Sequence, residues 1–92
     1  MGIRLDHIGI AVDDLDSGSV FWKLLGLRQG DDERNDEQGV NIRFFETEPG
    51  TNATRIELLE PIDEDTPIGR FLNKKGAGIQ QIAFRVDDLN SL

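Results

Sequence analysis

The sequence predicts an α+β fold, in which one βαβββ unit is followed by the first strand of a second such unit. The main observation is an internal repeat. The segment "LDHIGIAVDDLDS" at residues 5–17 returns as "IQQIAFRVDDLNS" at residues 79–91, with a shared Ile, V-D-D-L and Ser at a constant offset of 74 residues. Between the copies lie segments with the two-residue alternation of strands and segments with helical spacing. A repeat at a fixed period indicates a duplicated supersecondary unit.

The first strand is predicted at residues 3–12, where Ile and Val alternate with small or polar residues. Successive side chains of a strand point to opposite faces. One face carries Ile8, Ile10 and Val12, and the other carries Leu5, His7, Gly9 and Ala11. The single histidine of the chain is therefore expected opposite the aliphatic face.

A short helix is predicted after this strand. Asp13, Asp14 and Asp16 supply its N-cap and the negative charge of its first turn. The helix is expected to end at Gly26, since glycine readily adopts the left-handed backbone conformation found at the C-terminus of helices. The apolar residues at helical spacing are Val20, Phe21, Leu24 and Leu25.

Three further strands complete the unit. An edge strand is predicted at residues 27–31, ahead of the polar turn region "GDDERNDEQG", and stronger strands are predicted at residues 40–46 and 54–60. On the second of the three, Val40, Ile42 and Phe44 oppose Asn41, Arg43 and Phe45. On the third, Ile56 and Leu58 oppose Arg55, Glu57 and Leu59.

A linker leads from this unit to the second copy of the repeat. Thr66 and Pro67 form the N-cap and first residue of a short helix, which "KKGAG" ends. A strand at residues 79–87 then places Ile82, Phe84 and Val86 opposite Gln81, Ala83 and Arg85. The predicted division is a βαβββ module at residues 1–60, a linker with a short helix at 61–78, and the start of a second, incomplete module at 79–92. About 40 more residues would complete that module, so the chain has the pattern of a truncated protein.

The charge balance limits the classes of partner. The chain has 10 basic and 18 acidic residues and a net charge of −8, which repels nucleic acid and anionic membrane surfaces. The absence of cysteine excludes disulfides, thiol nucleophiles and cysteine metal sites. No apolar run approaches the ~20 residues of a membrane span, and a cytoplasmic protein is the default expectation. A domain this small is marginal alone, which favours a partner subunit.

On each strong strand, the face opposite the aliphatic one has a similar composition. These faces combine polar side chains with small residues that leave space, as a concave ligand-binding surface requires. The polar set is His7, Arg43, Glu57, Gln81 and Arg85, and the small set is Gly9, Ala11 and Ala83. A solvated sheet face is the alternative interpretation, since antiparallel sheets often expose one face to water.

Three stretches carry a resemblance to one family: "LDHIGIAVDDLD", "EQGV" and "IELLEPIDEDTPIGRFLNKKGAGIQQIAFRVDDL". They are similar to the vicinal oxygen chelate superfamily, which includes glyoxalases, bleomycin resistance proteins and dioxygenases, and most similar to its methylmalonyl-CoA epimerases. The "ELLEP" segment, the "TPI" turn and the closing "IA-x-x-VDD" are the most specific parts. The resemblance implies a glyoxalase-like fold of paired βαβββ modules in a curved mixed sheet. It covers essentially the whole chain but only part of such an enzyme.

The resemblance also implies a metal site. The family binds a divalent metal, such as Co, Mn, Ni or Zn, with a His on the first strand, a Glu or Gln on the fourth, a His on the fifth and a Glu on the eighth. The first three positions correspond to His7, Glu57 and Gln81, and the fourth lies beyond the sequence. An amide oxygen binds hard cations, but it is a much weaker ligand than imidazole for transition metals. A metal held by these three residues is therefore expected to bind weakly or to be absent.

The reaction of such an epimerase needs a base on each face of the substrate's α-carbon and a cation near the enolate oxygen. The resemblance assigns one catalytic carboxylate to Glu37 of "EQGV". Arg43 and Arg85 are candidates for binding a substrate carboxylate or a CoA phosphate. The structural alternatives are a paired histidine at His7, a solvated turn residue at Glu37 and solvated arginines.

Several hypotheses remain open at this point. The first is an epimerase-like enzyme acting on a short-chain acyl-CoA thioester, in which a homodimer brings together two copies each of His7 and Glu57. The second is a non-catalytic small-molecule-binding or dimerisation module that has lost the metal site, which Gln81 favours. The third is a fragment of a longer protein. A lyase of the glyoxalase I type is a weaker enzyme alternative, because the linker resembles the epimerases.

Overall fold

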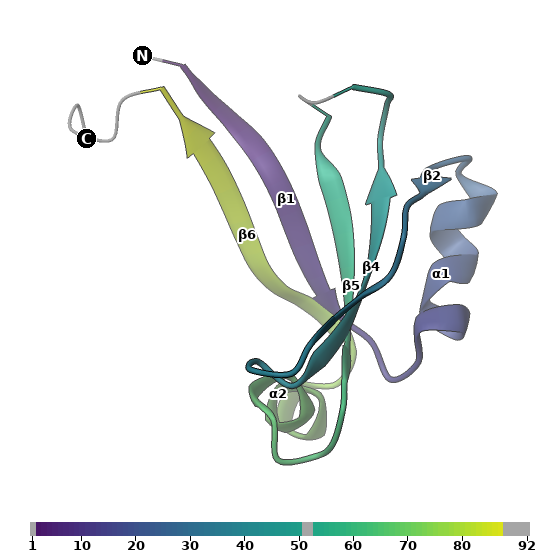
Figure 1. Cartoon of the computed structure of the whole chain (residues 1–92), viewed down its shortest axis with the longest axis vertical. Helices are drawn as coiled ribbons and strands as arrows, with labels where there is room; N and C mark the ends of the chain where they lie inside the picture. Colours follow the sequence, from purple (N-terminus) through teal and green to yellow (C-terminus); the bar gives the residue numbers. More distant parts are fainter. Residues whose placement is uncertain (1, 51–52, 88–92) are drawn as a thin grey trace.

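A mixed β-sheet carries two helices in the computed structural model, which describes residues 2–50 and 53–87 (Figure 1). In chain order the elements are β1 (Ile3–Ala11), α1 (Leu15–Leu24), β2 (Arg28–Gln29), β3 (Glu33–Asn35), β4 (Val40–Glu46), β5 (Arg55–Pro61), α2 (Pro67–Lys75) and β6 (Gly78–Val86). The strand order is β2-β4-β5-β1-β6, and β3 pairs with β4. The predicted α+β class with a mixed sheet is thereby confirmed. No helix of the described residues is long and apolar enough to cross a bilayer.

The two copies of the repeat pair with each other. β1 is antiparallel to β6, and Ile8 lies opposite Ile82, its own equivalent in the repeat. Next to this pair Gly9 faces Gln81, and His7 faces the residue equivalent to Gly9. Equivalent positions therefore exchange places about a local two-fold axis at the Ile8–Ile82 pair.

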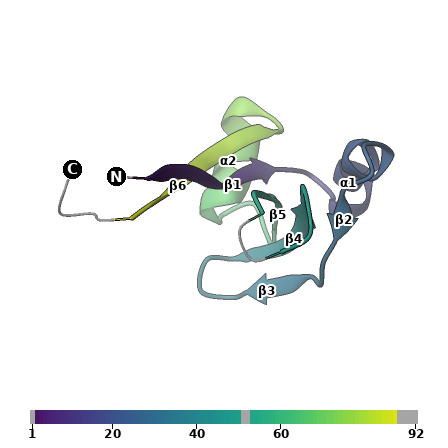
Figure 2. The same ribbon diagram turned by 90° about the horizontal axis from the view of Figure 1, so that it is seen from above.

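Within the described residues, β1 has a second neighbouring strand but its symmetry equivalent β6 does not. β5 lies parallel against the second edge of β1, whereas the corresponding edge of β6 has no partner strand among residues 2–50 and 53–87. Two views show β1 and β6 running together away from β4 and β5, towards the end where β1 starts and β6 finishes (Figures 1 and 2). The strand pair therefore forms an open arm of the sheet.

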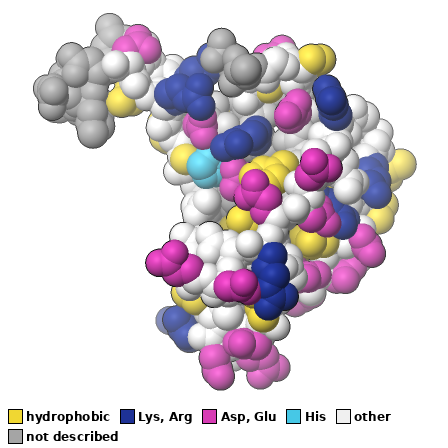
Figure 3. Space-filling view, viewed as in Figure 1, with side chains coloured by type: hydrophobic (Ala, Val, Ile, Leu, Met, Phe, Trp, Pro, Cys, Tyr) yellow, Lys and Arg dark blue, Asp and Glu magenta, His cyan; other side chains and the backbone are white. Residues whose placement is uncertain are grey.

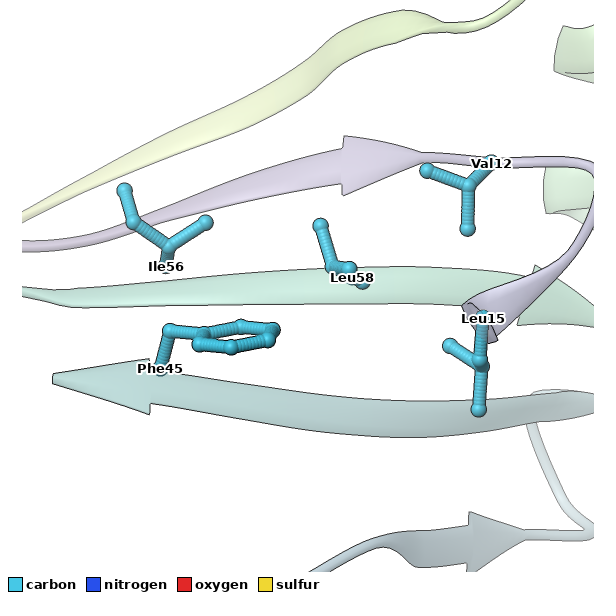
Figure 4. Close-up of a cluster of buried hydrophobic side chains, with 5 residues drawn as sticks. All are labelled: Val12, Leu15, Phe45, Ile56 and Leu58. Atoms are coloured by element: carbon cyan, nitrogen blue, oxygen red, sulfur yellow. The ribbon is translucent and has the colours of Figure 1, made fainter. Parts of the chain in front are cut away.

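The larger buried cluster lies between α1 and the sheet. It consists of Val12, Leu15, Phe45, Ile56 and Leu58 (Figure 4). Ile8, Ile10, Trp22 and Leu27 pack against it. The aliphatic faces predicted for the first strand and for residues 54–60 are confirmed, because both pack under a helix.

Helix α1 packs through a different stripe from the one its apolar residues suggested. Asp14 is its N-cap and accepts a hydrogen bond of 2.9 Å from the Ser17 N–H, in line with the predicted capping. The residues that pack inward are Leu15, Ser19 and Trp22. The expected stripe is 54–82% exposed and consists of Val20, Phe21, Leu24 and Leu25. Because the cap fixes the start of the helix at a buried Leu15, the period of about 3.6 residues turns positions 19 and 22 inward.

A smaller cluster lies on the opposite face of the sheet, beneath α2. It consists of Ala11, Val40, Leu59 and Ile68, with Ile42, Phe71 and Leu72 packed against it. The start of α2 is the predicted one, since the Thr66 hydroxyl accepts a hydrogen bond of 3.0 Å from the Gly69 N–H and Pro67 is the first helical residue. Ala11 therefore contacts the core of the protein and does not leave space for a ligand.

The register of β4 corrects one predicted face. Arg43 pairs with Leu58, whose side chain packs beneath α1, while Phe44 pairs with Glu57. Arg43 therefore lies on the α1 face, and the prediction that it shares the face of His7 is wrong. Both faces of β4 carry apolar side chains, so the alternation of this strand does not reveal which face is which.

Strand β3 lies inside the segment that was predicted as a polar turn. Asn35 pairs with Val40, so residues 36–39 form the loop of a hairpin between β3 and β4. All three residues of β3 are polar or charged, and no apolar alternation marks the strand in the sequence. The predicted edge strand at residues 27–31 is only Arg28–Gln29.

The division into modules at residues 60 and 78 remains a prediction. β5 ends at Pro61 and β6 begins at Gly78, with α2 between them. The predicted start of a helix in the second module lies at residues 88–92, outside the described part of the chain.

Candidate functional site

His7 lies on β1, near the local two-fold axis, and a β-bulge determines its surroundings. Leu5 pairs with Phe84 and His7 with Ala83, so Asp6 is an extra residue on β1. Such a bulge re-aims side chains, which alternate in a regular strand. The Asp6 Oδ2 atom lies 2.7 Å from the His7 Nδ1 atom, although the two residues are neighbours in the chain. Asp6 is thus a site residue that the alternation pattern hid.

Glu57 is the buried carboxylate of the site. It lies on β5 opposite Gly9, and only 8% of it is exposed. Its Oε2 atom lies 3.7 Å from the His7 Nδ1 atom and 3.3 Å from an Nη2 atom of Arg55. Glu57 and His7 therefore share a face, as the sequence predicted, and Arg55 balances the charge of the carboxylate.

Gln81 reaches His7 across Gly9. The Gln81 Nε2 atom lies 3.3 Å from the His7 Nε2 atom. Gly9 makes this path possible, because a Cβ atom at that position would lie 2.5 Å from the Gln81 Cγ atom. The space left by Gly9 is thus filled by the Gln81 side chain.

Two arginines flank the acidic side of the cluster. The Arg85 Nη2 atom donates to the Asp6 Oδ1 atom at 2.6 Å, and the Arg55 Nη2 atom lies 3.7 Å from the Asp6 Oδ2 atom. The hydrogen bond to His7, with the positive charges of Arg85 and Arg55, holds the pKa of Asp6 below its usual value. Figure 3 shows the histidine surface flanked by acidic and basic side chains. The predicted placement of Arg85 beside this face is supported by its contact with Asp6.

A cavity of about 360 Å³ opens beside this cluster. Three predicted site residues line it, namely Glu37, Glu57 and Gln81. Gln80 lines it as well, because a second bulge leaves that residue unpaired between Gln81 and Ile79 of β6. The remaining lining residues are Gln38, Val40, Ile42, Leu59, Pro67 and Ile68. The cavity therefore combines two carboxylates and three amides with an apolar wall.

Glu37 lies at the rim of this cavity, in the loop between β3 and β4. It is exposed, and a hydrogen bond of 2.9 Å from the Gln38 N–H to the Asn35 side chain shapes the loop. Gly39 ends the loop with a φ of 70°, a conformation that favours glycine. The "EQGV" motif thus places a carboxylate at the mouth of the cavity.

A second hollow, of about 480 Å³, lies on the other side of Asp6. Three guanidinium groups contribute to its wall, those of Arg28, Arg55 and Arg85, together with Asp6 and Glu46. In a chain of net charge −8, this is a local excess of positive charge. Such a wall suits an anionic group of a ligand.

Arg43 does not contact the His7 cluster and makes its hydrogen bonds on the opposite face of the sheet. On the α1 face its guanidinium donates to both carboxylate oxygens of Asp32 at 2.9 Å, to Asp16 at 2.9 Å and to the buried hydroxyl of Ser19 at 3.0 Å. The hydrogen bonds from Arg43 lower the pKa of Asp32, and those carboxylates raise the pKa of Arg43. These contacts join α1 and the loop after β2 to the sheet, so the geometry gives Arg43 a structural role.

The described residues do not form a closed metal site. Among residues 2–50 and 53–87 no group of three or more His, Asp, Glu or Cys side chains could hold an ion. The Glu57 carboxylate approaches the Nδ1 edge of His7, which Asp6 already occupies, whereas Nε2 points to Gln81. His7 and Glu57 therefore do not converge on one point, and the side chains of this part of the chain do not by themselves fit a tightly held metal ion.

Known proteins share this sequence and fold. The profile of the Glyoxalase/Bleomycin resistance protein/Dioxygenase superfamily matches residues 6–92. An uncharacterized protein, YqjC, of Bacillus subtilis is 44% identical over 82 residues, which are 88% of this chain and 56% of that protein. The ethylmalonyl-CoA/methylmalonyl-CoA epimerase of Cereibacter sphaeroides is 39% identical over 88 residues, which are 94% of this chain and 63% of the enzyme.

A solved structure agrees with these relatives. A variant of the Streptomyces coelicolor methylmalonyl-CoA epimerase, in complex with 2-nitronate-propionyl-CoA, superimposes with a TM-score of 0.83 at 37% identity, over 96% of this chain and 65% of that one. The chain thus spans between about half and two thirds of the length of the relatives that it matches. With the repeat, the mixed sheet and the profile match in agreement, the chain belongs to the glyoxalase/bleomycin resistance protein/dioxygenase superfamily.

Proposed function

We propose that this protein is a methylmalonyl-CoA epimerase-like protein, which moves the α-proton of a short-chain acyl-CoA thioester. The observation that carries the proposal is the cavity lined by Glu37, Glu57 and Gln81, next to His7. The related epimerases of Cereibacter and Streptomyces support the substrate class.

The chemistry begins with Glu37 as the base. Its carboxylate at the rim takes the proton from the α-carbon, the C–H bond breaks, and the electron pair moves to the thioester oxygen as an enolate. The apolar wall formed by Ile42, Leu59 and Ile68 contacts the alkyl part of the acyl group. Return of a proton to the opposite face requires a second acid from a module outside the described residues.

Arg85 is the proposed contact for an anionic group of the substrate. With Arg28 and Arg55 it lines the hollow of about 480 Å³ beside the His7 cluster. A guanidinium presents paired donors that match a carboxylate or a phosphate. A malonyl-type carboxylate or a CoA phosphate would offset the positive charge of this wall.

A divalent cation such as Co, Mn, Ni or Zn remains part of the proposal only with further ligands. His7 and Glu57 are the metal-binding side chains of the predicted set, and Gln81 would have to turn its amide oxygen towards the ion, because its amide nitrogen now faces His7. Ligands from another subunit or module would have to complete the coordination. We expect weak binding of such a cation by residues 1–92 alone.

A second module is the proposed partner, and a second copy of this chain is its simplest source. The edge of β6 that has no partner strand within the described residues lies on the open arm of the sheet, together with the exposed side chains of Ile79, Ile82 and Phe84. By the local two-fold axis, Ile82 is the equivalent of Ile8, which packs under α1. A homodimer in the cytoplasm is therefore the assembly that we propose.

A non-catalytic module that binds an acyl-CoA or dimerises is the second candidate function. It is favoured by Gln81, which contacts the one nitrogen of His7 that Asp6 leaves free. Such a protein would bind acyl-CoA without exchanging its α-proton.

Proton exchange separates the two candidates. Methylmalonyl-CoA in deuterated water with the protein should gain deuterium at the α-carbon, and Glu37→Gln should abolish the gain. Asp36→Asn is the matched control, since Asp36 is a neighbouring exposed carboxylate that pairs with Arg34. Acyl-CoA binding without exchange, at any loading with Co, Mn, Ni or Zn, would favour the non-catalytic module and reject the epimerase.

A further inference from the structure

We propose that Asp6 is a positioning residue, which holds the imidazole of His7 with its proton on Nδ1 and so makes Nε2 the nitrogen offered to a ligand. The inference rests on the proposed function only in taking His7 as a residue of the binding site. It concerns the hydrogen-bonding state of His7 in the protein itself.

The hydrogen bonds around the ring define this state. An ionised carboxylate only accepts hydrogen bonds, so at 2.7 Å from Asp6 Oδ2 the His7 Nδ1 atom must carry the proton. In a neutral ring the Nε2 atom then has the free electron pair. The Gln81 amide nitrogen, 3.3 Å away, donates to that pair. The three side chains therefore form a chain of donors that runs from Gln81 through His7 to Asp6.

Asp6 is itself held in place. The bulge in β1 turns its carboxylate towards the ring, and Arg85 donates to Oδ1 at 2.6 Å. Arg55 lies 3.7 Å from the other oxygen and also approaches Glu57. Since the two oxygens of Asp6 have separate partners, the carboxylate cannot turn without losing one of them. This is the arrangement by which carboxylates orient histidines in binding sites.

The same geometry predicts what an amide at this position would do. Arg85 is a donor only, so the Asn side chain in Asp6→Asn would turn its carbonyl oxygen towards Arg85. Its NH2 group would then face the His7 Nδ1 atom, which must accept. The proton of the neutral ring would move to Nε2. An isosteric change of one atom should therefore invert the tautomer.

The test is NMR of the imidazole nitrogens by long-range ¹H–¹⁵N correlation, on the ¹⁵N-labelled chain without added metal. His7 is the single histidine of the sequence, so its ring signals need no assignment. Where a pH series shows the ring signals of the neutral imidazole, the wild type should have a protonated Nδ1 and an unprotonated Nε2. Asp6→Asn should show the reverse. Asp36→Asn, the same change at an exposed pair, should leave the wild-type pattern.

The outcome does not depend on epimerase activity. A wild-type ring with its proton on Nε2, or with both tautomers in comparable amounts, would overturn the proposal even if no variant folded. An Asp6→Asn protein that folds and keeps the wild-type pattern would also overturn it. In the double variant Asp6→Asn with Arg85→Gln the amide is released from Arg85, and the proton should return to Nδ1 in a measurable fraction. If the NMR result stands while deuterium exchange is absent, the role of Asp6 holds and the catalytic proposal fails.

Discussion

Gly9 and Gln81 lie opposite each other on β1 and β6, so close that a methyl group on Gly9 would be 2.5 Å from the Gln81 Cγ atom. This contact allows Gln81 to lie across β1 and reach His7. In the repeat, Gln81 is the equivalent of His7 and faces Gly9 across the local two-fold axis. The pairing of the two copies therefore places the two equivalent side chains in contact.

Gly9→Ala should separate Gln81 from His7. The added methyl group forces the Gln81 side chain to rotate, and because that side chain is exposed, the free energy of unfolding should change by less than about 1 kcal/mol. The nuclear Overhauser contact between the Gln81 amide and the His7 ring should disappear. Gly78→Ala is the matched control, since a Cβ atom there meets no atom within 4 Å. A contact that survives in Gly9→Ala would contradict the close approach.

Arg43→Met should destabilise the fold and leave the His7 site intact. The substitution removes the hydrogen bonds from Arg43 to Asp32, Asp16 and the buried Ser19. The free energy of unfolding should fall by about 1–3 kcal/mol. This is less than the loss expected on breaking a fully buried ion pair, because both carboxylates reach water. Urea unfolding measures the loss, and the ring signals of His7 report on the site. Arg34→Met, at an exposed pair, should cost at most about 0.5 kcal/mol. Loss of acyl-CoA binding without loss of stability would restore Arg43 as a substrate contact.

The Asp32–Arg43 pair should make the free energy of unfolding depend on pH in the acidic range. The hydrogen bonds from Arg43 lower the pKa of Asp32 in the folded protein below its ordinary value of about 3.9. The unfolded chain then binds the proton more readily, so the stabilisation is complete above pH ~4 and is lost as pH falls through the folded pKa. Urea midpoints of the wild type and Asp32→Asn should therefore converge below pH ~4. A difference that stays constant from pH 7 to acid would show that the pair contributes no proton linkage.

Gln81→His should strengthen the binding of Co or Zn. An imidazole beside His7 adds a strong nitrogen ligand, and we expect an affinity at least tenfold above wild type, measured by calorimetry. Gln29→His on exposed β2 controls for a surface histidine. Adding His7→Ala to Gln81→His should remove the gain. If Gln81→His binds metal no better than Gln29→His, position 81 is not a ligand position.

Phe84→Asp should dissociate the proposed homodimer. Phe84 is 63% exposed on the open arm of the sheet, and a buried, unpaired carboxylate in an apolar interface is costly. Light scattering of the purified chain should give twice the monomer mass for the wild type and the monomer mass for the variant. Leu24→Asp, at the 82% exposed Leu24 of α1, should leave the mass unchanged. A monomeric wild type would reject the homodimer.

The sequence pattern was sufficient to predict the features that depend only on neighbouring residues in the chain. The caps at Asp14 and Thr66 form as predicted, because a side-chain oxygen three residues before a free N–H needs no tertiary contact. The His7 and Glu57 faces also follow from alternation, since Ile8, Ile56 and Leu58 lie on the opposite face and pack beneath α1. The stripe of α1 was predicted wrongly, because hydrophobicity alone does not say which apolar residues find a neighbour.

The site residues that the sequence did not reveal depend on pairing between distant segments. Regular alternation would place neighbouring residues on opposite faces, and the register shift against β6 is what turns Asp6 towards the His7 ring. The face of Arg43 was misassigned because β4 is apolar on both faces. Its partner Asp32 comes from the loop after β2, which no periodicity marks.

The sequence by itself determined the superfamily, the duplicated strand and the presence of His7, Glu57 and Gln81 on one face, because repeats and alternation are written along the chain. Only the tertiary structure decided that Asp6 holds His7, that Gln81 fills the space above Gly9, and that Arg43 binds α1 to the sheet. Those contacts depend on strand register and bulges, which are determined by backbone hydrogen bonds between residues as far apart as Gly2 and Asp87.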